Sequence, residues 1–331
     1  MVYRILMNSI LQQLIAYAIL APSAHNTQPW IFFIKKNTVE IKPNMQLRLK
    51  ISDTSNRELY ISLGTAAENL AQAAKAFGLQ HKTTIAQNES KITSILFEIL
   101  GNSISNDLDT KLLSALKTRH TNRNLFENKP LPEKFLNFLD DLNVPGIYVT
   151  HYESATLRNS LANLSGLAAA EAFQDKAFRI ELSNWVKPNL KRFRSGMPGY
   201  TLGFPWLISF IMPFVIRTFD IGTIQKKMHI DWINHSACCL VISVAQENST
   251  SLINVGRIFE QIAIEAEKIN IRSAILTAPI EIGQWPYKLK ELVGLPGRPV
   301  LFARLGYGKP MTKKAPRMGI EQFINQQPEI N

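Results

Sequence analysis

Two segments, GTAAENLAQAAKAFGL at residues 64–79 and GRIFEQIAIEAEKINI at residues 256–271, resemble each other and decide the fold. Each repeats its apolar residues at the three-to-four-residue spacing of an amphipathic helix, with small residues along one face. Identical residues stand at Gly64/Gly256, Glu68/Glu260, Ala71/Ala263 and Ala74/Ala266. Because helices approach closely where both faces are small, we expect these two helices to pack against each other.

A second match follows each helix in the same order, with LFEILG at residues 96–101 and LFARLG at residues 301–306. Amphipathic helices resemble one another through periodicity alone, whereas two matches in order indicate a duplicated unit. The sequence therefore predicts an α+β fold of two related halves, residues 1–112 and 113–331. The halves would be fused as a pseudo-dimer, with the two helices on its pseudo-twofold axis.

Hydrophobic patterning also predicts the other elements of both halves. Residues 62–77 should form the first long helix, with Gly78 at its C-terminal cap. The other expected helices cover residues 8–20, 108–118 and 254–268. The expected strands cover residues 30–35, 38–42, 82–87, 92–100, 236–245 and 299–305.

The composition is that of a globular protein with ample core material, since 46% of the 331 residues are hydrophobic. Lys and Arg number 37 against 26 Asp and Glu, a formal charge of +11. Such an excess suits nucleic acid, an anionic membrane or an anionic ligand, or reflects solubility alone. The densest basic stretch is KPNLKRFR at residues 187–194, and no nucleic-acid-binding signature accompanies it, so we expect no nucleic-acid partner.

Cys238 and Cys239 lie side by side in an apolar run, which predicts small buried side chains in a reducing compartment. Two adjacent cysteines provide no disulfide framework and no metal-ligand spacing, so no metal site is expected. The apolar N-terminal run resembles a signal peptide, but Gln12 and Gln13 interrupt it and its apolar residues share one helical face. We therefore expect a cytoplasmic protein that retains this helix.

The apolar run GFPWLISFIMPFVI at residues 203–216 is too short to span a bilayer and contains Pro205 and Pro213. It fits a buried core segment, a lid over a ligand or a membrane-surface contact. The first two are favoured, and stable membrane insertion is not expected. The segment lies within an insert at about residues 185–235.

Two loops carry the candidate chemistry. APSAHNTQPW at residues 21–30 has more hydrogen-bonding groups than a connection needs, which predicts a loop that faces a ligand. In RHTNR at residues 119–123, two guanidinium groups and a hydroxyl suit a phosphate, to which Lys314 and Arg317 could add. The alternative for RHTNR is a solvated helix end, where basic residues are common.

Together these segments resemble the nitroreductase superfamily of FMN enzymes. The resemblance rests on an RRS-type element at Arg119-His120-Thr121, a PSxxNxQPW-type loop from Pro22 to Trp30, and a closing GYG…PR segment at residues 306–308 and 316–317. The loop precedes the RRS-type element here, whereas the order is the reverse in ordinary members. That order and the double architecture look like the Acg branch, the dormancy-associated nitroreductase-like proteins.

The resemblance implies a nitroreductase-like fold with one FMN per chain, held between the halves. The FMN tail would lie against Arg119, His120, Thr121, Arg123, Lys314 and Arg317. The isoalloxazine ring would lie against Pro22, Ser23, Ala24 and Asn26 of the other half. Glu281 and Ile282 would lie near flavin N5, and no catalytic side chain is assigned. His25 is interpreted as an ordinary loop residue.

The implied function is a flavoprotein oxidoreductase that passes hydride equivalents from NAD(P)H to a nitro, quinone or similar small-molecule acceptor. An alternative is a protein that binds or sequesters FMN with little or no turnover. A third possibility is a basic scaffold with a decayed site, associated with a membrane or partner. A fused pseudo-dimer further predicts a monomer.

Overall fold

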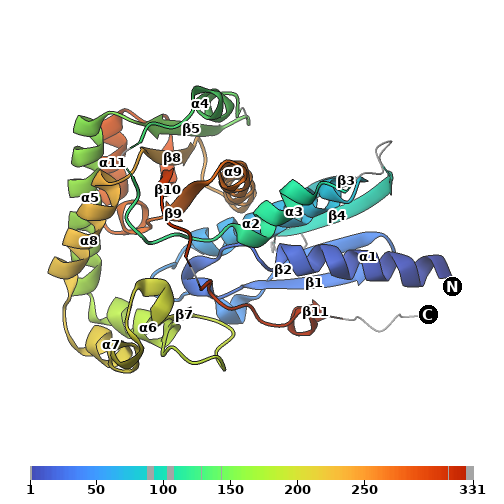
Figure 1. The fold of residues 1–331 in the computed structure, drawn as a ribbon, viewed down its shortest axis with the longest axis horizontal. Helices are drawn as coiled ribbons and strands as arrows, with labels where there is room; N and C mark the ends of the chain where they lie inside the picture. The colour runs from blue at the N-terminus through green and yellow to red at the C-terminus, as the bar shows by residue number, and fades with distance from the viewer. Residues whose placement is uncertain are drawn as a thin grey trace.

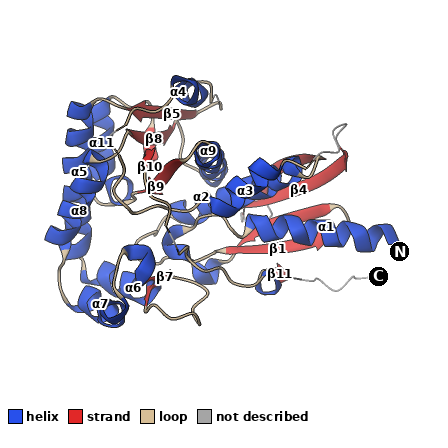
Figure 2. Ribbon diagram, in the orientation of Figure 1, coloured by secondary structure: helices blue, strands red, loops and turns tan. Residues whose placement is uncertain are grey.

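The computed structural model describes residues 2–87, 93–102, 108–127, 129–142, 144–311 and 313–325. The predicted strand at 92–100 therefore begins outside the described residues. Two principal β-sheets lie toward opposite ends of the molecule, and two long helices meet between them (Figure 1; Figure 2). The architecture is α+β, as the sequence predicts.

The first half places helices against a sheet with the strand order β11-β1-β2-β4-β3. Its helices are α1 (Val2–Ala18), α2 (Arg57–Ala76) and α3 (Thr110–Thr118). Its strands are β1 (Trp30–Lys35), β2 (Thr38–Pro43), β3 (Leu79–Gln87) and β4 (Thr93–Asn102). Gly78 has a φ of 66° just beyond α2, the left-handed conformation expected of a glycine that ends a helix.

The second half has a sheet with the order β5-β8-β10-β9. Its strands are β5 (Ile147–Tyr152), β8 (Cys238–Val244), β9 (Ile271–Ile275) and β10 (Arg298–Tyr307). Its helices are α4 (Glu133–Asp140), α5 (Ala155–Gln174), α6 (Lys176–Trp185), α7 (Trp206–Thr218), α8 (Gly222–Asn234), α9 (Ser249–Lys268), α10 (Ala278–Glu281) and α11 (Trp285–Val293). Between α6 and α7 the chain forms two short strands, β6 (Val186–Lys187) and β7 (Met197–Pro198), which pair in parallel with each other.

The two sheets share one topology. In the first half, β2 leads into α2 and then into the antiparallel pair β3–β4, with β4 beside β2. In the second half, β8 leads into α9 and then into the antiparallel pair β9–β10, with β10 beside β8. The matched sequences LFEILG and LFARLG therefore lie on corresponding strands, β4 and β10.

Helices α2 and α9 cross where their matched glycines meet, which confirms the predicted packing. A Cβ atom added to Gly64 would lie 2.0 Å from the carbonyl oxygen of Ile253. The reciprocal Cβ on Gly256 would lie 2.0 Å from the carbonyl oxygen of Ile61. Neither position has room for a side chain, because the backbones themselves are in contact.

The C-terminal segment returns from the second half to the first. After β10 the chain runs past the middle of the molecule, and β11 (Ile324–Asn325) pairs parallel with β1 through Phe32 and Phe33 (Figure 1). Phe323 is buried in the core of the first half. The segment after β10 thus ties the halves together and brings its basic residues to their junction.

Segment 203–216 is not the buried core segment that its composition suggested. Most of it forms α7, where the side chains of Trp206, Leu207 and Phe214 are 58%, 72% and 64% exposed. No single described helix is long and apolar enough to cross a membrane. Together α7 and α8 reach that length and composition, but the pair is bent by 115°.

Strands β5 and β9 were not predicted from the sequence. IYVTHY in β5 contains polar residues on both faces, and β9 is short and follows directly on a helix. The buried strand containing Cys238 and Cys239 was predicted correctly.

Replacing Gly64 by Ala should destabilise the fold, although Ala ordinarily favours a helix over Gly. The new methyl group would collide with a backbone carbonyl and push α2 from α9, at a cost of roughly 2 kcal/mol or more. Urea unfolding measures the change. Lys75→Ala on the exposed face of the same helix is the matched control, and equal stability of the two variants would contradict the crossing.

Candidate functional site

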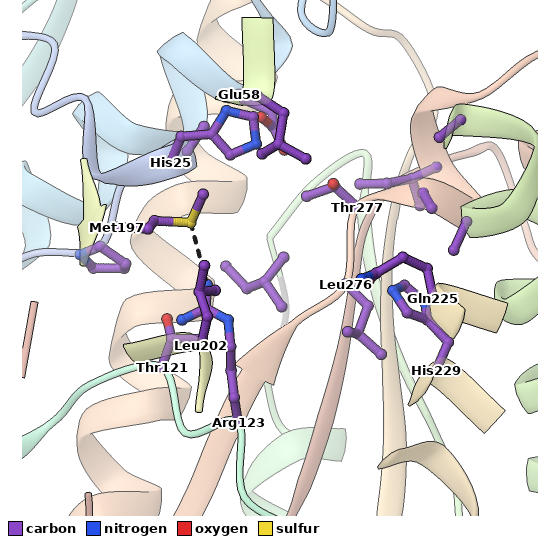
Figure 3. Close-up of a pocket in the computed structure, with 18 of the residues that line it drawn as sticks. His25, Glu58, Thr121, Arg123, Met197, Leu202, Gln225, His229, Leu276 and Thr277 are labelled. Carbon is purple, nitrogen blue, oxygen red and sulfur yellow. Dashed lines mark hydrogen bonds between the residues drawn. The ribbon is translucent and has the colours of Figure 1, made fainter. Parts of the chain in front are cut away.

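Two adjoining cavities lie between the halves, with volumes of about 270 Å³ and about 100 Å³. The loop after α1 and one face of α2 wall them from the first half. The chain after α3, the ends of β9 and β10, and helices α5 to α8 wall them from the second. Both cavities are lined by Pro22, Ser23, His25, Thr121, Arg123 and Met197. Figure 3 shows His25, Thr121, Arg123 and Met197 facing this shared space.

The two cavities differ in chemistry. The larger is mainly apolar, and much of its wall comes from Phe173, Phe178, Leu182, Leu202, Phe204, Ile216 and Met228. The smaller is basic and is lined by Lys117, Arg119, His120, Arg123, Lys313, Lys314 and Arg317. No Asp or Glu is among the described residues that line the smaller cavity. The pair therefore suits an elongated ligand with an apolar body and an anionic end.

The loop at residues 21–30 divides its side chains between the cavity and the surrounding chain. His25, Asn26 and Gln28 have positive φ values of 48°, 57° and 55°, a conformation that His and Asn tolerate better than most residues. Asn26 Nδ2 donates to the carbonyl oxygens of Gly196 and Pro316, at 2.9 and 3.0 Å. Pro22, Ser23, Ala24 and His25 are left to line the larger cavity.

Gln28 also connects this loop to other segments of the chain. Its Nε2 donates to the Arg194 carbonyl at 2.9 Å, and its Oε1 accepts from the Met318 amide at 3.1 Å. The polar residues of this loop thus bind the insert and the segment after β10 as well as bordering the cavities. Asn26, which the resemblance placed along the ring, borders the smaller cavity instead.

Arg317 holds this loop in place. Its guanidinium donates to the carbonyls of Ile19, Leu20 and Ala21 at 2.8–3.0 Å, and to Asn26 Oδ1 at 2.9 Å. Burial lowers the pKa of Arg317 to about 9. Because backbone carbonyls already occupy its donors, Arg317 acts chiefly as a frame for the cavity wall.

Arg119 is also engaged within the protein. Its Nε lies 2.7 Å from Glu260 Oε1 on α9, and its Nη2 donates to the Leu20 carbonyl at 2.9 Å. Burial raises the pKa of Glu260 to about 7, and the Arg119 guanidinium opposes this rise. Each side chain compensates the buried charge of the other, so removing either would leave its partner unpaired.

Arg123 differs from both. Among the described residues its acceptors are the Thr201 carbonyl at 3.5 Å and Met197 Sδ at 3.8 Å, which are weak contacts for a cation, and no described acid forms an ion pair with it. Desolvation lowers the pKa of Arg123 to about 10. A guanidinium enclosed with poor acceptors is unfavourable unless an anion joins it. Arg123 is therefore the best-placed cation for an anionic ligand.

The backbone around Arg123 is positioned by Arg304 of β10, which sequence reasoning missed. Arg304 Nη2 donates to the carbonyls of Asn122 and Asn124 at 3.0 and 2.8 Å. The Arg304 guanidinium also stacks over the Phe126 ring at 3.9 Å. Asn122 of RHTNR and the nearby Asn124 are thus fixed by Arg304 of β10, which a solvated helix end would not require.

His120 and Lys314 border the smaller cavity while bonding to the backbone. His120 Nδ1 lies 2.7 Å from the Thr118 carbonyl, and its Nε2 accepts from the Met311 amide at 3.4 Å. Burial lowers the pKa of His120, so this imidazole is neutral at pH 7. Lys314 Nζ donates to the Lys117 carbonyl.

His25 is more than the ordinary loop residue that the sequence suggested. It borders both cavities, and its buried Nδ1 has no hydrogen-bond partner within the described chain. Desolvation lowers the pKa of His25 to about 4, so the ring is neutral. Figure 3 shows its imidazole on the side of the cavity where Glu58 lies.

Glu281 and Ile282 do not line either cavity. Thr277, Ala278 and Ile280 stand there instead, at the end of β9 and the start of α10. Glu281 is buried beside Glu58, which does line the larger cavity. Burial, chiefly, raises the pKa of Glu58 to about 7 and that of Glu281 well above its usual range, so this pair holds a proton.

The structure brings the other ten predicted residues to the two cavities. Ala24 lines the larger, Asn26, Arg119, His120, Lys314 and Arg317 line the smaller, and Pro22, Ser23, Thr121 and Arg123 line both. Sequence reasoning missed Glu58, Ser62, Thr65 and Thr277. The first three lie on α2, whose regular pattern predicted only a packing helix, and no local signal distinguishes them.

No protein-family model matches the chain. It is 22% identical over 297 residues to "Putative NAD(P)H nitroreductase Rv3131" of Mycobacterium tuberculosis, covering 88% of this chain and 83% of that protein. The chain is similar to nitroreductases. "Uncharacterized protein Rv3127" of the same organism is 22% identical over 332 residues, covering 97% of this chain and 94% of that protein.

Similar solved structures include the FMN-dependent nitroreductase NfnB from Mycobacterium smegmatis in complex with NADPH, at 14% identity and a TM-score of 0.44. Another is a nitroreductase with bound FMN from Desulfitobacterium hafniense, at 13% identity and a TM-score of 0.41. Each similarity covers 67% of this chain and 100% of the other chain. At these identities the comparisons show what the chain is similar to.

Glu58→Gln should flatten the pH dependence of stability. The folded protein keeps a proton on Glu58 up to about pH 7, whereas the unfolded chain releases it near 4.5. The folded state therefore binds more protons between these values, and the free energy of unfolding falls as pH rises through that window. Urea unfolding at several pH values measures the slope. Exposed Glu133→Gln is the control, and an unchanged slope in Glu58→Gln would refute the buried proton.

Proposed function

We propose that the chain is an FMN-dependent oxidoreductase that passes hydride equivalents from NAD(P)H to a nitro, quinone or similar small-molecule acceptor. The observation that carries the proposal is Arg123, which has no acid partner among the described residues and lies where an apolar cavity joins a basic one. FMN has a flat, largely apolar ring and an anionic phosphate, and this donor set suits both ends.

The residues that would hold FMN follow from the two linings. Arg123, Thr121 and Lys314 would bind the anionic tail, while Arg119 and Arg317 keep the surrounding carbonyls and loop in position. Pro22 to His25 would border the ring on one side, and Thr277 and Ala278 on the other. Bound FMN supplies two-electron transfer, and the protein supplies binding, orientation and electrostatics.

The chain's own groups prepare the larger cavity for such chemistry. Apolar side chains of the insert exclude water, which strengthens the electrostatic interactions inside. Glu58 places a protonated carboxyl at the cavity wall, and neutral His25 adds a ring nitrogen with no other partner. These groups can exchange protons with a bound molecule.

FMN sequestration is the second candidate. Three helices of the insert and its surroundings cover the larger cavity as a lid would. The side chains that do so are Phe178 and Leu182 of α6, Ile216 of α7 and Met228 of α8. If this wall stays closed, NAD(P)H and the acceptor cannot reach the ring. The same residues that exclude water would then suppress turnover.

The same proposal has five further parts. The protein belongs to the Acg branch, is a single-chain pseudo-dimer whose halves divide at residue 112, is a monomer and is cytoplasmic. The order of the two loops along the chain supports the Acg branch. The shared topology of the sheets and the Gly64–Gly256 crossing support the pseudo-dimer. Size-exclusion chromatography with light scattering tests the monomer.

Visible spectra of the purified protein, recorded before and after anaerobic addition of NADPH, separate the candidates. An oxidoreductase should be yellow, bleach with NADPH and recover its colour with a nitro compound or quinone. A sequestering protein should be yellow and bleach with dithionite but not with NADPH. A colourless protein that takes up no added FMN would overturn both and leave the decayed scaffold.

Arg123→Met should lower FMN affinity by roughly tenfold to a hundredfold, since a charge-assisted bond contributes about 1.5–3 kcal/mol. Fluorescence titration with FMN measures the change. The exposed Arg48→Met is the matched control. Arg119 is a poorer choice, because its loss would leave the buried Glu260 unpaired. Unchanged affinity in Arg123→Met would reject the assigned cation.

A further inference from the structure

Helix α7 has its apolar side turned outward. Trp206, Leu207, Phe210, Ile211 and Phe214 are 41–72% exposed. At 100° per residue these five positions fall within a sector of about 140° on the helix surface. A surface helix of a globular protein normally turns its apolar stripe to the core and its polar residues to water. The outer face of α7, defined by these five residues, reverses that rule.

The opposite side of α7 is already used. Ser209 and Ile216 are buried, and Met212 packs with the small apolar cluster around Phe173 and Met197. Ile216 also lines the larger cavity. Helix α7 therefore has one packed side and one exposed apolar side. Figure 1 places α7 at the outer edge of the molecule.

A basic loop is fixed beside the start of α7. The amide of Asn189 donates to Ser209 Oγ at 3.0 Å, and Asn189 Nδ2 donates to the Phe204 carbonyl at 3.1 Å. Lys191, Arg192 and Arg194 of this loop are exposed. Between residues 185 and 228 the acidic residue is Asp220, whereas the basic ones are Lys187, Lys191, Arg192, Arg194, Arg217, Lys226 and Lys227.

We propose that the outer face of α7 and the basic loop at residues 187–194 form a docking surface for an anionic lipid bilayer, with α7 lying in the plane of the interface. Large apolar side chains enter the region between headgroups and acyl chains, where Trp is especially favourable. Lys and Arg beside them are attracted to anionic headgroups. Both features occur here on one segment.

Other occupants fit less well. A transmembrane span needs about 20 apolar residues, whereas α7 has 13 and turns by 115° into α8. A symmetric dimer through the outer face would pair the same apolar patch on both copies, but it would leave the basic loop at residues 187–194 without an anionic partner. An anionic bilayer satisfies the apolar and basic residues together.

Co-sedimentation of the full chain with vesicles tests the proposal. The protein should bind vesicles that contain about one-third phosphatidylglycerol, bind phosphatidylcholine vesicles at least tenfold more weakly, and dissociate as salt rises. Leu207→Glu with Phe214→Glu should reduce binding at least tenfold. Lys191→Glu, Arg192→Glu and Arg194→Glu together should remove the preference for anionic vesicles.

The matched control is Leu100→Glu with Leu108→Glu, which adds the same charge at two exposed leucines of the first half. Circular dichroism and bound FMN check that each variant folds. The proposal is overturned if wild type binds neither vesicle, or if the control loses binding equally. It is also overturned if Leu207→Glu with Phe214→Glu dissociates a dimer of a protein that does not sediment with vesicles.

Discussion

The structure depends on the contact between two backbones at Gly64 and Gly256. With no side chain at either position, α2 and α9 approach until each glycine meets the other helix's carbonyl region. This approach brings the sheets of the two halves to opposite sides of one helix pair. It also places Glu260 of α9 within reach of Arg119, so the crossing that joins the halves also neutralises a cation at the edge of the smaller cavity.

The site is assembled by side chains that bind the protein itself as much as by side chains that face the cavity. Arg317 fixes the loop after α1, Arg304 fixes the chain around Arg123, and Asn26 joins three segments. Their donors are occupied by carbonyls, whereas Arg123 keeps only weak acceptors. Arg123 is thus available to a ligand because the neighbouring arginines, Arg119, Arg304 and Arg317, are engaged within the protein.

The sequence predicted the helix pair, most strands and ten of the twelve candidate residues at the cavities, because those features have local signals. Periodicity marks α2 and α9, and the dense polar loops mark the site. It could not distinguish Arg119 and Arg317 from Arg123, since their different roles come from partners far along the chain. It did not show that Glu281 and Ile282 lie outside the cavity lining, where the turn into α10 presents Thr277 and Ala278. The sequence also suggested that the segment forming α7 is buried in the core, because apolar composition alone does not show which side of a helix faces water.

The path of the chain after β10 has a consequence for biosynthesis. Residues 313–318 supply part of the basic wall and hold the loop at residues 21–30, and β11 then pairs with β1. Residues early in the sequence thus depend on residues late in the sequence before the cavity wall closes. A nascent chain that has emerged only through β10 lacks the clamp on this loop, and it also lacks β11 and Phe323, which complete the sheet and the core of the first half. Completion of the cavity wall therefore has to follow synthesis of the segment after β10.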